Sequence, residues 1–254
     1  MRKLESNISV HHEPFQDIVR YENESLHSSS ITNSNIGSPL FFNCTLHGLT
    51  FENCDLNNAK FFADCTIEEC KFIRCDLRAV GIADNEAVFT NCEFVSCDMR
   101  GMTLENATFI HCSFLKCKFN DRTLQAARMV NCTFTGKLVD ITFEGNGQQS
   151  LQVNLEQCTL NGVGFIGCDL SECTPPKTKH HLYVEDMSVR AKHAVLHRDH
   201  EVTLSDDEEK MLVRRLRKLE QAKQYIFNIA DMKKVYGEPF VQAFLKCLDL
   251  DATR

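Results

Sequence analysis

Cysteine and histidine are the residues of this 254-residue chain whose numbers most clearly suggest metal or redox chemistry. The chain contains 14 cysteines and ten histidines. Zinc needs four ligands that converge as a tetrahedron, usually from two close pairs. Nearly all of these cysteines instead recur at multiples of five residues, which spreads them along the chain. We interpret them as small buried side chains, because this regular spacing does not gather four ligands for zinc, and parallel side-chain directions and a reducing compartment argue against disulfides.

Five of the ten histidines cluster in the last third of the chain, at His180, His181, His193, His197 and His200. His193 and His197 are four residues apart, and His200 follows them. Two histidines at this spacing on a helix are half of a metal site, but no His-Glu-x-x-His motif is present. We expect a solvated polar face here, with no metal and no cofactor, and keep a metal-dependent enzyme that uses this cluster as an alternative.

The other motifs that mark catalysis are missing from the sequence. Phosphate-binding loops, dinucleotide fingerprints and nucleophile elbows each need glycines at fixed spacings, with a lysine in the phosphate loop and a serine in the elbow. The glycine-rich stretch Gly145–Asn146–Gly147–Gln148 has no such lysine. We therefore predict no catalytic residue and a protein that is not an enzyme.

A five-residue period organises the chain between Phe41 and Phe143. A large apolar residue occupies every fifth position, and a small residue such as cysteine or alanine stands two places before it. This period matches neither an amphipathic helix nor an alternating strand, so it indicates an internal repeat. Four segments show it as they stand: CDLNN from Cys54, CDLRA from Cys75, CDMRG from Cys97 and CDLSE from Cys168.

These segments resemble the pentapeptide-repeat family over about residues 24–173. The resemblance implies an all-β, right-handed, four-sided β-helix with four pentapeptides in each coil. When the sequence is stacked four pentapeptides at a time, residues of the same type fall in the same column. This alignment supports the implied fold. One column contains Phe51, Phe72, Phe94, Phe114 and Phe134, accompanied by Cys70, Cys92, Cys112 and Cys132. Its neighbour contains Leu56, Leu77, Met99 and Phe119, accompanied by Cys54, Cys75, Cys97 and Cys117.

The repeat divides the chain into four parts. We expect residues 1–23 to cap the first coil, and residues 24–173 to form about seven coils, with a loop leaving the sixth near 145–150. We predict that residues 174–203 form a linker with a short helix near residues 185–197. Residues 204–254 read as a helical hairpin: a capping-box start at Ser205, one helix to about Tyr236, and another from Pro239. This hairpin would either cap the last coil or form a homodimer.

The net charge and the hydropathy of the sequence limit the kinds of function that the protein can have. The net charge of −7 disfavours direct nucleic-acid binding, and no apolar run is long enough to span a membrane. We expect a cytoplasmic protein, with delivery into a host cell as an alternative. We predict a protein-interaction surface, as in a bacterial effector or regulator.

The alternative function follows from the resemblance. Family members of the quinolone-resistance (Qnr) type are dimers that imitate DNA on the topoisomerase gyrase. In this chain the matching surface would be an acidic ridge of Asp55, Asp76 and Asp98, together with the loop of Gly145, Asn146, Gly147 and Gln148. Arg122 departs from the pattern, because it occupies a position that the family keeps small, and its role stays open.

Overall fold

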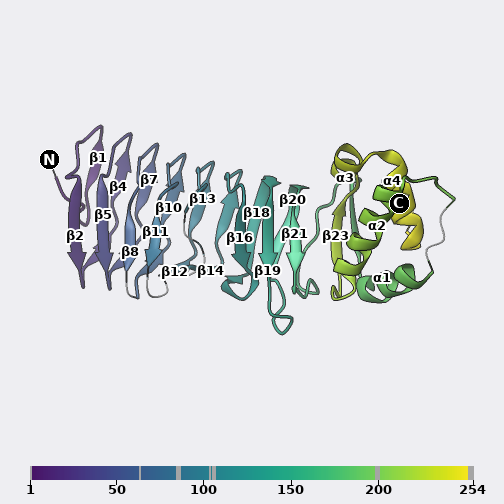
Figure 1. Ribbon diagram of the computed structural model, residues 1–254. Helices are drawn as coiled ribbons and strands as arrows, with labels where there is room; N and C mark the ends of the chain where they lie inside the picture. The colour runs from purple at the N-terminus through teal and green to yellow at the C-terminus, as the bar shows by residue number, and fades with distance from the viewer. Residues whose placement is uncertain are drawn as a thin grey trace.

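The chain forms a long four-sided β-helix, here called the solenoid, and a small helical domain, here called the cap, which lies against its last coil (Figure 1). This computed structural model describes residues 2–62, 64–83, 87–102, 104, 107–197 and 201–250. The solenoid strands pair in parallel from coil to coil. The repeats thus produce the predicted solenoid.

The longest face of the solenoid has eight stacked strands. They are β1 (Ser9–His11), β4 (Ser30–Thr32), β7 (Thr50–Glu52), β10 (Lys71–Ile73), β13 (Glu93–Val95), β15 (Ser113–Leu115), β18 (Cys132–Val139) and β20 (Val153–Asn161). The last seven are the coils that the repeat predicts, and β1 adds one more before them.

Two further faces are built in the same way. One contains β3 (Ser25–His27), β6 (Thr45–His47), β9 (Thr66–Glu68), β12 (Ala87–Thr90), β14 (Ala107–Ile110) and β17 (Met129–Val130), the last preceded by a 3-10 turn at Ala126–Arg128. The other contains β2 (Ile18–Glu22), β5 (Ser38–Phe42), β8 (Lys60–Phe62) and β11 (Gly81–Ala83), then β16 (Arg122–Gln125), β19 (Ile141–Glu144) and β21 (Gly164–Ile166). The fourth side is held by single bridges that join Asn35, Asp55, Asp76, Asp98 and Lys118.

Residue type explains the short strands and sharp corners. Most strands are three residues long, with the central side chain buried and its neighbours turned outward. The residue after such a strand often has a positive φ, for example 51° at both Asn33 and Asn53. Asparagine tolerates this left-handed conformation better than most residues, so the chain can turn the corner without glycine.

The predicted columns are confirmed in register. Phe72 pairs with Phe51 and Phe94, and Phe114 pairs with Phe94 and Phe134. The ring centroids of successive members lie 4.8–5.5 Å apart with nearly parallel planes. The bridge ladder on the fourth side brings Leu56, Leu77, Met99 and Phe119 into the neighbouring column, and all four are buried. The interior is therefore filled by side chains.

The predicted boundary at residue 24 is wrong, because residues 1–23 are not a separate cap. Val10 of β1 pairs with Ile31, and the ring of Tyr21 on β2 stacks on Phe41 at 5.1 Å. These residues thus continue the same columns as a first coil. Only the segment ahead of β1 closes this end: Leu4 is buried beneath Tyr21, and its backbone N–H donates to the Tyr21 hydroxyl.

The predicted helical hairpin over residues 204–254 is also wrong. Its first helix, α2 (Asp206–Leu219), begins at the expected capping box of Ser205 and Glu208 but ends at Leu219. A strand, β23 (Tyr225–Asn228), then pairs antiparallel with β22 (His181–Val184). Two further helices follow, α3 (Ile229–Tyr236) and α4 (Glu238–Cys247), and Pro239 lies in the first turn of α4 as expected.

Residues 174–203 are correspondingly more than a linker. They supply β22 and the predicted short helix, α1 (Met187–Leu196). The cap therefore has four helices around a two-stranded sheet, with its own core centred on Leu212, Leu216, Phe240 and Phe244. Among the described residues, no helix is both long and apolar enough to cross a membrane.

Candidate functional site

The predicted acidic ridge exists in space, but most of its charge is paired. Asp76 accepts hydrogen bonds from the guanidinium group of Arg78, and Asp98 accepts them from Arg100, with closest N–O distances of 2.6 and 2.7 Å. Each aspartate also accepts the backbone N–H two residues ahead. The Arg78 side chain holds the pKa of Asp76 below its usual range.

Asp55 has the same turn-forming role, because its carboxylate accepts the N–H of Asn57. The next position along the ridge is Lys118. These aspartates therefore stabilise corners of the solenoid. Their arrangement offers far less free negative charge than the column of aspartates suggests on its own.

The predicted loop lies between β19 and β20. Asn146, Gly147 and Gln148 are exposed, and the Asn146 side chain accepts the N–H of Gln148. Gly145 and Gly147 still donate backbone hydrogen bonds to the following coil, at Ile166 and Gly167. The loop is thus held against the solenoid at its base and presents polar groups to solvent.

The predicted histidine cluster is only partly within the described residues. The rings of His193 on α1 and His197, which follows the last residue of α1, lie 4.9 Å apart, and both residues are exposed. His200 lies outside the part of the chain that the structure describes. Within that part, no three histidine, cysteine or acidic residues are placed to hold a metal ion.

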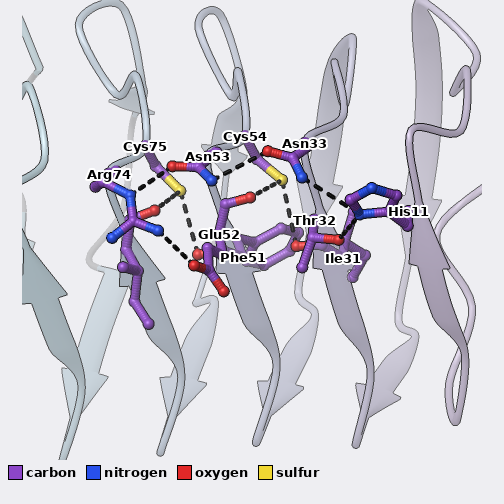
Figure 2. Close-up of polar contacts among 11 residues, drawn as sticks. His11, Ile31, Thr32, Asn33, Phe51, Glu52, Asn53, Cys54, Arg74 and Cys75 are labelled. Carbon is purple, nitrogen blue, oxygen red and sulfur yellow. Dashed lines mark hydrogen bonds and ion pairs between the residues drawn. The ribbon is translucent and has the colours of Figure 1, made fainter.

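All 14 cysteines are buried, and the 13 in the solenoid have free thiols. In the two columns that pack beside the phenylalanines, each thiol donates to a carbonyl oxygen of the preceding coil. Cys54, Cys75 and Cys97 donate to Ile31, Phe51 and Phe72, with S–O distances of 3.1–3.3 Å (Figure 2 shows the first two). Burial raises the pKa of Cys54 to about 11 and that of Cys132 to about 12. These thiols therefore serve the packing between coils.

Arg122 likewise belongs to the interior. It pairs in register with Ile141, which is fully buried, and the side chain of Arg122 is itself half-buried. Its Nε atom is enclosed without a hydrogen-bond partner among the described residues. The position that the repeat keeps small is thus filled by an arginine without a break in register.

One corner of the solenoid carries an outer polar ladder that no local sequence pattern indicates. Asn53 donates to Asn33 at 3.0 Å, and Arg74 donates to both Asn53 and Glu52 (Figure 2). These residues are one coil apart, so their separation of about 21 positions hides the contacts from local sequence patterns. These hydrogen bonds hold the polar side chains at this corner in place.

Beside this corner, three outward-facing apolar side chains form a stripe. Ile73, Val95 and Leu115 follow each other in register on β10, β13 and β15 of the eight-stranded face (Figure 1 labels β10 and β13). All three are half-buried, since each one shields its neighbours. We call these three residues the outer stripe. It is an apolar surface on a flat β-sheet face.

The junction between the solenoid and the cap uses polar side chains in place of another coil. The backbone N–H groups of Leu160, Gly162 and Leu170 donate to the side chains of His181, Asp231 and Gln224 at 2.9–3.0 Å. Asn228 donates to the Leu160 carbonyl oxygen, and Lys223 forms an ion pair with Asp169. Ile226 joins the solenoid core, and Tyr225 packs on Phe165. No sequence motif marked these residues.

Repeat and fold together define a β-solenoid built from pentapeptide repeats, with a cap of its own. A family model described as pentapeptide repeats matches residues 85–121 with eight copies. The predicted resemblance is therefore confirmed: residues 85–121 match pentapeptide repeats, and the strands before and after them continue the same stacked coils. No curated protein sequence matches this chain.

The comparison with solved structures supports the fold through QnrB1. A trypsin-treated form of QnrB1, a plasmid-mediated fluoroquinolone resistance protein, aligns at a TM-score of 0.50 and 14% identity over 67% of this chain and 85% of QnrB1. HetL, a pentapeptide-repeat protein involved in heterocyst differentiation regulation from the cyanobacterium Nostoc sp. strain PCC 7120, aligns at a TM-score of 0.30 and 12% identity, over 65% of this chain and 87% of HetL. At this identity the likeness to QnrB1 concerns the fold alone.

The hydrogen bonds at the junction lead us to predict that the stability of the folded protein depends on pH. Leu160 donates to His181 Nε2, so the ring proton is on Nδ1, where it meets Thr178. Burial, with a smaller contribution from His180, lowers the pKa of His181 in the folded protein. The unfolded chain therefore binds the proton more readily, and stability is lost as pH falls below about 6.5, the unperturbed histidine pKa.

Urea unfolding of the wild type and of His181→Gln between pH 5 and pH 8 tests this prediction. Glutamine can accept the same hydrogen bond without titrating, so the variant should lose less stability on acidification than the wild type. His181→Ala should cost about 1–3 kcal/mol at pH 8, because it leaves the Leu160 N–H without its partner. Parallel pH curves for wild type and His181→Gln would contradict the assignment.

Proposed function

We propose that this protein is a non-enzymatic scaffold that binds another protein through the outer stripe of Ile73, Val95 and Leu115. The stripe carries the proposal, because three adjacent, partly exposed apolar side chains form a continuous apolar strip on a flat face, and such patches mark interaction sites. The buried thiols and the packed phenylalanine columns support it further, since they leave the interior no room for a substrate. A bacterial effector or regulator is the kind of protein that this proposal describes.

The surroundings of the stripe suit a protein partner. Arg74 and Glu52 lie at one corner beside it, and Lys71 and Glu93 form an ion pair on the same face. An apolar centre with a charged, solvent-accessible rim is the usual anatomy of a protein interface. The flat strands also provide a rigid surface, so that little ordering is needed on binding.

Site-specific photo-crosslinking tests the proposal. A benzoyl-phenylalanine at Val95 should give a discrete crosslinked product in an extract of the host. The same residue at Thr66, which faces outward on β9 of the neighbouring face, should not. Ile73→Lys should weaken the capture, since a central interface residue is worth roughly 2 kcal/mol, about a thirtyfold change in affinity. Equal products from Val95 and Thr66, or no effect of Ile73→Lys, would contradict the proposal.

A second candidate is binding to a topoisomerase as a mimic of DNA, which the likeness in fold to QnrB1 favours. Its contacts would be Asp55, Asp76 and Asp98 with the loop of residues 145–148. The ion pairs of Asp76 and Asp98 with Arg78 and Arg100 weaken it, because they leave little of the dense charge of duplex DNA.

A supercoiling assay with purified gyrase, with and without a quinolone, decides this second candidate. The DNA-mimic hypothesis predicts that the protein changes gyrase activity or relieves the quinolone. It also predicts that Asp55→Asn weakens this effect more than Asp140→Asn, a change of equal charge on another side of the solenoid. Unchanged activity under both conditions would remove the topoisomerase hypothesis.

A further inference from the structure

We infer that a pocket at the junction of solenoid and cap binds the C-terminal residue of a partner polypeptide, namely an apolar side chain together with its terminal carboxylate. The pocket has a volume of about 250 Å³. Its walls come from β21, α2 and β23. The inference names a site for the interaction function proposed above and rests on that proposal.

The floor of the pocket is apolar. Phe165 of the last coil, Leu219 at the end of α2 and Phe227 of β23 meet there, and all three are buried. Ile166 stands at the rim with 59% of its surface exposed, the highest exposure of any large apolar solenoid residue after Ile18. Gly164 contributes no side chain, which leaves space beside Phe165. An apolar side chain could enter and bury Ile166 as well.

Two cations border this floor. Arg215 and Lys218 lie one turn apart on α2 and both line the pocket. The guanidinium group of Arg215 stacks on the ring of Tyr236 at 4.4 Å and donates to its hydroxyl group. Among the described residues, no carboxylate lies within ion-pair distance of Arg215 or Lys218. The stacked guanidinium therefore retains N–H groups for an anionic ligand.

The charges around Arg215 determine on which side of this residue a carboxylate would bind. A neighbouring cavity of about 410 Å³ shares Arg215 but is also lined by Asp140 and Asp231. A carboxylate is repelled on that side and attracted on the side of Lys218. A planar guanidinium suits a carboxylate because it can form two parallel hydrogen bonds. We therefore place the carboxylate between Arg215 and Lys218, above the apolar floor.

The size of the pocket points to a chain end. Small-molecule sites usually enclose about 300–1,000 Å³, so this pocket is too small for most of them and suits a single side chain with an attached carboxylate. Capture of a terminal carboxylate is a recurring mode of peptide recognition. Because the pocket is open at the Ile166 rim, the rest of the chain could leave over the solenoid surface.

Two matched ligands test the chemistry. N-acetyl-L-phenylalanine carries the apolar side chain and the carboxylate, whereas N-acetyl-L-phenylalaninamide differs only in lacking the charge. In amide NMR titrations the acid should shift Gly164, Ile166 and Phe227 in a saturable way, and the amide should bind about tenfold more weakly, as expected for the loss of one charge-assisted contact. Equal binding of acid and amide, or binding of neither, would overturn the inference.

Matched variants locate the site. Arg215→Gln and Lys218→Gln should each weaken binding of the acid severalfold. Arg217→Gln should not, because Arg217 is exposed on the same helix and does not line the pocket. Lys218 is also exposed, so its replacement should leave the fold intact, as the NMR spectrum will show. An effect of Arg217→Gln equal to that of Lys218→Gln would contradict the site.

A pentapeptide ending in phenylalanine separates a chain end from a free small acid. We expect it to bind at least as tightly as N-acetyl-L-phenylalanine, and weaker binding would contradict the assignment to a partner polypeptide. The result of this test can be distinguished from the result of the test of the outer stripe. If crosslinking from Val95 succeeds while neither acid nor pentapeptide binds, the pocket inference fails and the proposed function stands.

Discussion

The parallel backbone ladder between coils is the constraint on which this structure depends. Successive strands lie about 4.8 Å apart, so any residue faces its counterpart in the coil above and below. The side chains of a column pack closely only if they have similar size and polarity. This explains the stacked rings of Phe72, Phe94 and Phe114. It also explains the cysteines, which are small enough for the corner and can donate to the preceding coil.

A ladder of this kind leaves unpaired backbone groups at both ends, and such edges invite uncontrolled pairing with other chains. The chain closes its two ends differently. At the first coil, the Ser6 hydroxyl donates to the Ser25 carbonyl and accepts the His27 N–H. At the last coil, the cap supplies His181, Asp231 and Gln224 as hydrogen-bond acceptors.

The sequence predicted the solenoid well because its period is local and repeated. It predicted the first coil poorly, since Val10, Phe15 and Tyr21 lack the cysteine partners that mark later coils. The single helix expected from 205 to 236 failed for a tertiary reason. Ile226 has helical spacing from Leu219, but it is buried in the solenoid core as part of a strand. Local spacing cannot reveal that an apolar residue packs on a distant element.

The candidate site shows the same limit. The five-residue register placed Asp76 and Asp98 in one column, but it did not reveal that Arg78 and Arg100 neutralise them. The pairing could have been noticed, because an arginine follows each aspartate by two residues. By contrast, Gln224 and Asp231 contact residues 54 and 69 positions away. No local pattern identifies such pairs, and the same holds for the pocket between β21 and α2.

The central claim is that side chains of the cap take the place of the next coil. Amide hydrogen exchange measured by NMR tests it most directly. The account predicts that the N–H groups of Leu160, Gly162 and Leu170 exchange as slowly as that of Leu77, which donates within the ladder to Asp98. Rapid exchange of these three amides, at the rate of exposed loop residues such as Gln149, would contradict it.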